Sequence, residues 1–146
     1  MKQIETEIDI NAPAGKVWSI LTDYESHAKW NPFIKSIAGD KNRGGSLIVR
    51  IHPPGGSAMT FKPVIVTFDS PNEFRWKGKL GIPGLFDGEH YFMLKEEKNK
   101  TRFIHGEKFT GILVGLFGKT LDKTRRGFDL MNEALKAECE KSSRPD

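Results

Sequence analysis

The most regular pattern of apolar and polar positions lies near the C-terminus. From about Gly115 to Lys141, apolar side chains recur at steps of three and four residues, which is the spacing of one face of an amphipathic helix. This face consists of Phe117, Leu121, Thr124, Phe128, Met131 and Leu135. Such a face must pack on another apolar surface, so we expect the preceding chain to supply one.

The N-terminal residues predict a strand followed by two short helices. Residues 2–10 alternate apolar or small side chains with charged and amide side chains, as a half-buried strand does. Pro13 suits the first turn of a helix, which we predict over Ala14 to Leu21. A second short helix is expected to begin within residues 22–25 and to stop before Trp30.

The middle of the chain predicts strands alone. Short alternating segments are separated by clusters of Gly, Pro, Asn and Asp, and such short links favour antiparallel neighbours. The expected strands are Ile34 to Ala38, Leu47 to His52, Met59 to Phe68, Glu73 to Leu80, His90 to Lys95 and Thr101 to Leu113. Pro63 cannot donate to a strand ladder and should mark a bulge or an edge. The fold class is therefore α+β, with a curved antiparallel sheet of about seven strands wrapped around the long helix.

Composition limits the protein class. A chain of 146 residues with 37% hydrophobic residues can form one domain around one core, so we expect a single domain over residues 1–146. The net charge of +4 is scattered, and nothing calls for nucleic acid as a partner. We expect a cytoplasmic protein, because the sequence shows no signal peptide and no membrane-spanning apolar run, and because its single cysteine, Cys139, forms no internal disulfide. Cys139 is expected to be structural or inert.

The order of these elements resembles the SRPBCC, or START-like, superfamily, in particular its small bacterial polyketide cyclase/dehydrase-like branch. The segments that carry the resemblance are Ile8–Pro13, Val17-Trp18, Trp30–Phe33, Gly88–Phe92, Thr101–Gly111 and the terminal helix. The resemblance implies a helix-grip fold, in which the sheet wraps the long helix and a cavity lies between them. It specifies the scaffold more strongly than the activity, because this superfamily varies what the cavity holds.

The last two predicted strands place ionisable side chains on an aromatic face. If Glu96 lies opposite Thr101, then Leu94 meets Phe103, Phe92 meets His105, and His90 meets Glu107. A slip of one residue would turn Lys95 and Lys108 inward, which argues for this assignment. We therefore expect His90, His105 and Glu107 together on the inner wall.

Several roles are compatible with this trio. It can be a satisfied structural pair or a solvated cavity mouth, or it can anchor the polar end of a ligand. A third possibility is general base catalysis of an aldol-type ring closure or a dehydration, with Glu107 orienting an imidazole. A two-histidine, one-carboxylate metal set is the weakest alternative, and we expect no metal and no cofactor.

The remaining candidate positions are mostly aromatic. Together with the trio, the expected lining of the cavity consists of Trp30, Phe33, Met59, Phe61, Trp76, Phe92, Phe109, Phe117, Leu121, Thr124 and Phe128. All of these can equally be plain core, and Trp30 and Phe33 can simply close a turn over it. Gly78 leaves a gap on the same face, and Gly127, in mid-helix, suggests the close approach of another group. The apolar segment from Gly111 to Gly118, flanked by basic residues, is either a lid that meets a membrane transiently or a packed strand-to-helix junction.

We therefore predict binding of a hydrophobic or aromatic small molecule, lipid-like or polyketide-like, between the sheet and the C-terminal helix. The first alternative, implied by the resemblance, is a cofactor-independent polyketide cyclase or dehydratase. The second is a protein-interaction module, like the superfamily members that stimulate heat-shock chaperones. The sequence determines neither the ligand nor the oligomeric state.

Overall fold

The computed structural model describes residues 2–79, 87–111 and 118–141. The expected helices and strands are found there, except that the single strand expected from Met59 to Phe68 is divided into two. The helical elements are α1 (Ala14–Leu21), the 3-10 turn η1 (Tyr24–Ser26), α2 (His27–Trp30) and α3 (Gly118–Lys141). The strands are β1 (Lys2–Ile10), β2 (Ile34–Gly39), β3 (Leu47–Ile51), β4 (Met59–Phe61), β5 (Val64–Asp69), β6 (Glu73–Lys79), β7 (Asp87–Glu97) and β8 (Lys100–Thr110). None of the described helices is long and apolar enough to cross a membrane.

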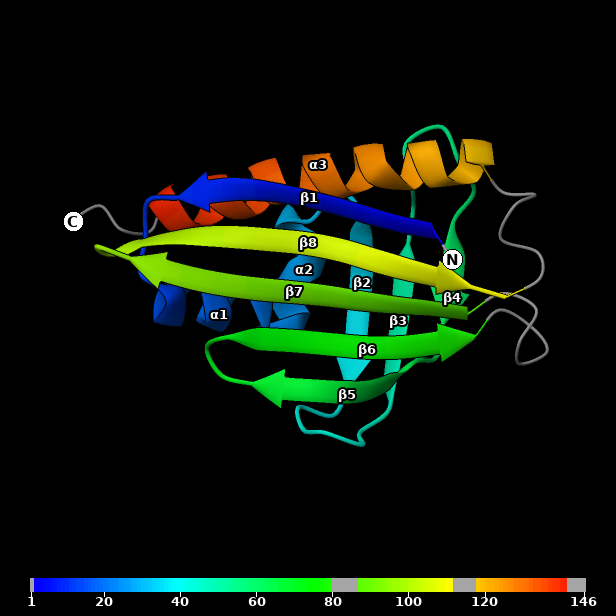
Figure 1. The fold of residues 1–146 in the computed structure, drawn as a ribbon, viewed down its shortest axis with the longest axis horizontal. Helices are drawn as coiled ribbons and strands as arrows, with labels where there is room; N and C mark the ends of the chain where they lie inside the picture. Colours follow the sequence, from blue (N-terminus) through cyan, green and yellow to red (C-terminus); the bar gives the residue numbers. More distant parts are fainter. Residues whose placement is uncertain (1, 80–86, 112–117, 142–146) are drawn as a thin grey trace.

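The described strands form two antiparallel sheets. A five-stranded sheet has the order β1-β8-β7-β6-β5, and a three-stranded sheet has the order β2-β3-β4. Figure 1 shows the second sheet crossing behind the first. Neighbours within β5 to β8 follow chain order, as their short links predict, whereas β1 closes the sheet by pairing with β8.

Pro63 separates the two sheets. The expected single strand from Met59 to Phe68 is divided into β4 and β5, because proline has no N–H with which to continue a ladder. The junction is held by the N–H of Leu47, which donates to the carbonyl of Pro63 at 3.0 Å, and by the N–H of Ile65, which donates to Gly45 at 2.8 Å. The chain therefore turns from one sheet into the other without losing pairing on both sides of the proline.

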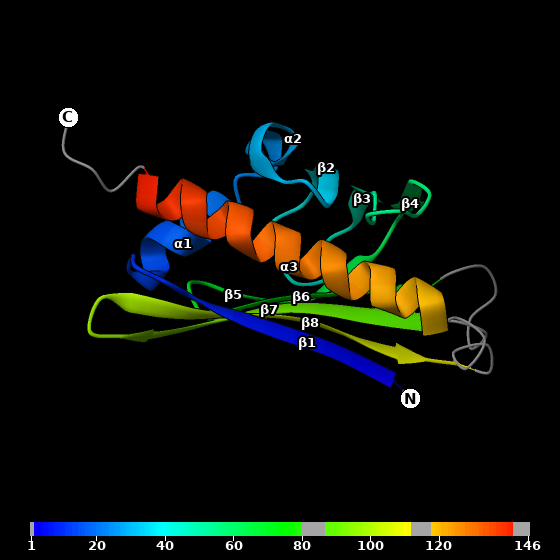
Figure 2. The ribbon, with the colours of Figure 1, turned by 90° about the horizontal axis from the view of Figure 1, so that it is seen from above.

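Helix α3 lies along the inner face of the five-stranded sheet, so that the fold is the expected helix-grip arrangement (Figure 2). Its buried side chains in the described part confirm the predicted face and continue it to Cys139. They are Leu121, Thr124, Phe128, Met131, Asn132, Leu135 and Cys139. At the C-terminal end of the helix, Lys136 donates to the carbonyl of Asp9 in β1 at 2.8 Å, and the N–H of Asn11, just after β1, donates to Glu140 at 2.9 Å.

The helical elbow of α1, η1 and α2 covers one end of this core. Asn31 ends α2, because its side-chain oxygen accepts hydrogen bonds from the N–H groups of both Phe33 and Ile34, each at 2.9 Å. This turn directs the Phe33 ring onto α3, where a methyl group on Gly127 would overlap it. The close approach expected at Gly127 is therefore made by Phe33, which supports the interpretation that this residue closes the core.

Candidate functional site

The candidate site is built on the inner face of the hairpin formed by β7 and β8. The register is the predicted one: Leu94 pairs with Phe103, Phe92 with His105, and His90 with Glu107. A two-residue turn at Lys98 and Asn99, both with positive φ, closes the hairpin. The trio of His90, His105 and Glu107 is therefore brought together on one wall, as expected.

A continuous hydrogen-bond chain connects these side chains to α3 and β1. His90 Nδ1 lies 3.3 Å from Glu107 Oε1, and His90 Nε2 lies 2.7 Å from His105 Nε2. His105 Nδ1 lies 2.9 Å from Asn132 Oδ1. Asn132 Nδ2 then donates to Thr6 Oγ1 at 2.8 Å, and the Thr6 hydroxyl donates to the carbonyl oxygen of His105 at 3.0 Å. Four elements thus contribute to one polar chain through the core.

Aromatic rings enclose the two imidazoles. Phe128 of α3 stacks on His105 with ring centroids 3.9 Å apart, and Trp76 of β6 stacks on His90 at 4.8 Å. Phe92 contacts both imidazoles, with centroids 4.9 Å from His90 and 4.8 Å from His105. These rings exclude water from the histidines, whose polar atoms must therefore be satisfied within the chain.

Burial shifts the pKa values of the trio in the direction that favours neutral groups. Removal from water lowers the pKa of His90 to about 3 and places that of His105 well below its usual value. The neighbouring His90 lowers the pKa of His105 further, whereas the hydrogen bond to Asn132 opposes this effect. The same desolvation raises the pKa of Glu107 to about 8. Near neutral pH, Glu107 is therefore largely an uncharged carboxylic acid.

Glu107 is the solvent-accessible end of this hydrogen-bond chain. Its side chain is 19% exposed, against 5% for His90, while His105 is completely buried. Its second oxygen, Oε2, lies over Gly88, where any larger residue would overlap the carboxyl group. In the described part of the chain, Oε2 has no hydrogen-bond partner. Glu107 therefore offers one oxygen to the protein interior and one to the outside.

The sequence of this chain matches one family model over nearly its whole length. The model described as polyketide cyclase / dehydrase and lipid transport matches residues 1–141. The chain belongs to this family. The description of the family supports a role in hydrophobic-ligand binding or a cyclase-type function. Among curated proteins, no sequence matches significantly.

Solved structures share the fold of this family member at low sequence identity. The Zhui aromatase/cyclase from a Streptomyces species is 16% identical, with a TM-score of 0.78 over 98% of this chain and 96% of that one. A START superfamily protein from Mycobacterium smegmatis is also 16% identical, with a TM-score of 0.73 over 96% and 98% of the two chains. Protein MLL2253 from Mesorhizobium loti is 14% identical, with a TM-score of 0.75 over 99% and 100%. These likenesses confirm the START-like fold.

The other candidate residues of this family member occupy different environments. Phe33, Trp76, Phe92, Phe109, Leu121, Thr124 and Phe128 are buried, whereas Trp30, Met59 and Phe61 are half-buried. Met59 and Phe61 belong to β4, in the three-stranded sheet. At Gly78, where a gap is expected, an added Cβ atom would lie at ordinary van der Waals distance from Pro63. Phe117 and most of the segment from Gly111 to Gly118 lie outside the described residues.

Sequence reasoning missed Asn132 and did not assign a role to Thr6. Both are buried: Asn132 is the partner of His105 Nδ1, and Thr6 accepts a hydrogen bond from the side chain of Asn132. A signal was present for Asn132, because a carboxamide directly follows Met131 on the apolar side of the helix. Thr6 was placed on the inner face of β1 by alternation, and its pairing with His105 confirms that placement.

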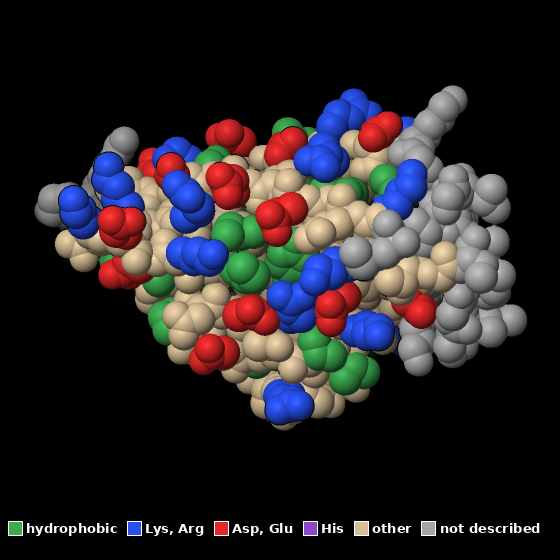
Figure 3. Space-filling view, in the orientation of Figure 1, with side chains coloured by type: hydrophobic (Ala, Val, Ile, Leu, Met, Phe, Trp, Pro, Cys, Tyr) green, Lys and Arg blue, Asp and Glu red, His purple; other side chains and the backbone are tan. Residues whose placement is uncertain are grey.

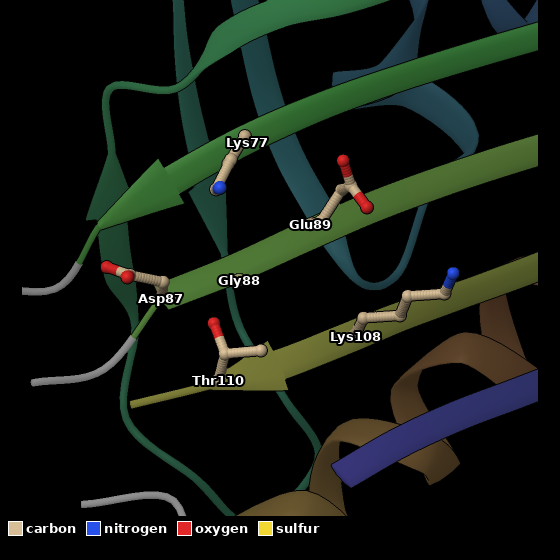
Figure 4. Close-up of a pocket in the computed structure, with 6 residues that line it drawn as sticks. All are labelled: Lys77, Asp87, Gly88, Glu89, Lys108 and Thr110. Atoms are coloured by element: carbon tan, nitrogen blue, oxygen red, sulfur yellow. The ribbon is translucent and has the colours of Figure 1, made fainter. Parts of the chain in front are cut away.

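A separate depression lies on the outer face of the sheet, at the ends of β6, β7 and β8 (Figure 4). It has a volume of about 190 Å³ and is lined by Lys77, Asp87, Gly88, Glu89, Lys108 and Thr110. Figure 3 shows positive and negative side chains interspersed on this face, where Arg75 pairs with Glu73 at 3.1 Å and with Glu89 at 3.3 Å. Within the described residues, no group of three or more His, Cys, Asp or Glu side chains is arranged to hold a metal ion.

Proposed function

We propose that the protein binds a hydrophobic or aromatic small molecule between the five-stranded sheet and α3, with Glu107 contacting its polar end. The observation that carries the proposal is the partly exposed carboxyl group at the end of an otherwise aromatic wall. Ligand pockets typically combine an apolar lining with a few placed polar groups. The family's description, which includes lipid transport, supports the same chemistry.

The geometry narrows the role of the trio in this proposal. All four imidazole nitrogens of His90 and His105 already have partners within the protein. A ligand would have to break those hydrogen bonds to contact either ring, and a buried polar atom left unpaired costs about 1 to 3 kcal/mol. We therefore assign the direct contact to Glu107 and a supporting role to the two histidines.

The first experiment is mass spectrometry of organic extracts from the purified, denatured protein. It is paired with thermal shifts of the intact protein against fatty acids, aromatic polyketides and isoprenoids. We expect a stoichiometric compound, or stabilisation of several degrees by one class, because a ligand bound only by the folded state raises its stability. If no compound is extracted and no class stabilises the protein, the proposal is wrong.

A pair of variants then tests the place of binding. Glu107→Leu should weaken the thermal shift by the active class. Glu89→Leu removes a carboxyl group from the same sheet on the neighbouring rung, where Glu89 pairs with Lys108 on the outer face, and should leave the shift unchanged. Equal effects of the two substitutions would contradict binding at the inner face.

Acid–base catalysis is the second candidate function, namely a cofactor-independent cyclisation or dehydration. Two observations favour it. Glu107 and His90 share one proton in their hydrogen bond, which can lie on either residue, and the pKa of the Glu107 carboxyl group is near 8. This reverses the expected roles, since the carboxyl group and not an imidazole meets the substrate. Under this proposal, Glu107→Gln should abolish turnover and leave affinity nearly intact, because an amide forms similar hydrogen bonds without transferring a proton.

The interaction-module alternative has no specific support in the described residues. The large apolar side chains that are exposed there, Ile48, Val64 and Leu130, lie on three different elements. A docking surface would need them in one contiguous patch.

A further inference from the structure

Each hydrogen bond of the chain can be assigned a donor and an acceptor, which gives the chain a direction. The assignment starts at the buried end, at Thr6. A backbone carbonyl can only accept, so the Thr6 hydroxyl, 3.0 Å from the carbonyl oxygen of His105, must direct its proton there. The lone pairs of Thr6 Oγ1 are then left for Asn132, whose side-chain nitrogen donates to them at 2.8 Å. The amide of Asn132 is thereby oriented with its oxygen toward His105.

The orientation of Asn132 determines the tautomers of both histidines. Its oxygen accepts a hydrogen bond from His105, so the proton of His105 is on Nδ1. His105 is completely buried, and neither of its ring nitrogens contacts a carboxylate, so it is neutral and its Nε2 is an acceptor. The proton in the 2.7 Å contact between the two rings therefore belongs to His90 Nε2.

The outer end of the chain then has only one mobile proton. His90 already carries a proton on Nε2, so a neutral His90 accepts at Nδ1, and Glu107 Oε1 must donate to it. If the proton moves to His90, Glu107 becomes a carboxylate. In both states Oε1 is engaged with His90, and Oε2, over Gly88, carries lone pairs and no proton.

From this direction we infer that the site selects ligands that present a hydrogen-bond donor to Glu107 Oε2. Neutral phenols, enols and alcohols have such a hydroxyl group. Fatty acids and other carboxylates would instead place a carboxylate oxygen, which can only accept hydrogen bonds, against Glu107 Oε2, which is also an acceptor. Asn132 and Thr6 act as positioning residues, because they set this preference without contacting the ligand. The inference rests on the proposed function and specifies its ligand class.

Three naphthalenes of nearly equal size test the preference. Binding of 2-naphthol, 2-methoxynaphthalene and 2-naphthoate to the full chain is measured by calorimetry near neutral pH. We expect 2-naphthol to bind on the order of tenfold more tightly than the methyl ether, the worth of one hydrogen bond, and the naphthoate to bind no better than the ether. Equal binding of all three would overturn the inference while the proposed function survives. If none binds, the preference fails together with the binding function at this site.

The direction of the chain is tested independently by nitrogen-15 NMR of the histidines in the free protein. We expect His105 as the Nδ1–H tautomer and His90 as the Nε2–H form. The opposite tautomers would overturn the inference whatever the ligand results are.

Two substitutions separate positioning from simple packing. Thr6→Val keeps the shape but removes the hydroxyl, and should mix the tautomers of both histidines and reduce the naphthol preference to about twofold. Thr6→Ser restores the hydroxyl and should restore both. Unchanged tautomers in a folded Thr6→Val protein would show that Thr6 does not orient the chain.

Discussion

Substitution of Gly127 by alanine sets two opposing effects against each other. Glycine inside a helix costs about 1 kcal/mol relative to alanine, so propensity alone predicts that Gly127→Ala stabilises the protein. In the structure, however, the new methyl group would overlap Cδ1 of Phe33 and lie 2.7 Å from its Cε1. Phe33 is only 1% exposed and packs edge-on against Phe128, with centroids 5.4 Å apart, so the ring has no free space to enter.

The structure determines which effect dominates. Overpacking of a filled core typically costs about 1 to 3 kcal/mol, so the net change should lie between roughly zero and 2 kcal/mol of destabilisation. Gly15 in α1 provides the matched control, because nothing lies within 4 Å of the position of its missing Cβ. Gly15→Ala should gain up to about 1 kcal/mol.

The measurement is urea unfolding of the wild type and both variants, with equal m-values required so that midpoints report stability. A third variant, Gly127→Ala combined with Phe33→Leu, should show a smaller penalty for the alanine than is measured with Phe33 present, because the obstructing ring is gone. If Gly127→Ala stabilises the protein as much as Gly15→Ala does, the contact of α3 with the elbow is not tight and the reasoning is wrong.

Two further predictions follow from buried titratable groups. Burial raises the pKa of Glu107 from 4.5 to about 8, so between these values the folded state holds a proton that the unfolded chain has released, and stability falls as pH rises. His90, whose pKa is lowered to about 3, makes the free energy of unfolding rise with pH, but only up to about pH 6.5. From pH 6.5 to 8 the free energy of unfolding should therefore fall by about 2 kcal/mol as a result of Glu107. Denaturation series at several pH values check this: Glu107→Gln should remove the decline, and an unchanged decline would assign it to another group. Cys139, the single cysteine, is fully buried, with a thiol pKa raised by desolvation to about 12. A chromogenic thiol reagent should therefore react only after unfolding, and fast stoichiometric reaction of the native protein would contradict this.

The features predicted correctly from sequence are those that a local period determines. Alternation along two neighbouring strands predicted their inner faces, because a slip of one residue would have buried lysines, and the short link at residues 97–100 then placed His90 opposite Glu107. The buried face of α3 followed from its 3.6-residue period in the same way. Gly127 indicated a close approach because a glycine in mid-helix needs a reason.

The features that were missed depend on contacts between distant parts of the chain. The partners Asn132 and Thr6 are 126 residues apart, and no period in one sequence connects them. Pro63 was recognised as an interruption, but the isolated bridge between Ser46 and Val64 beside it is not revealed by a strand pattern. The direction of the hydrogen-bond chain could not be predicted either, since it depends on where the Thr6 hydroxyl points.

The pairing of β1 with β8 has a consequence for synthesis on the ribosome. Lys2 lies opposite Phe109, and Ile10 opposite Thr101, so β1 is synthesised long before β8, the strand with which it pairs. Asn132 is synthesised later than β8, and Lys136 and Glu140, which contact the end of β1, follow it. A nascent chain must therefore keep the amphipathic β1 without its partner until β8 has been made, a state prone to misassociation. The hydrogen-bond chain that ends at Glu107 joins β1, β8 and α3, so the candidate site can form only after Asn132 has been synthesised.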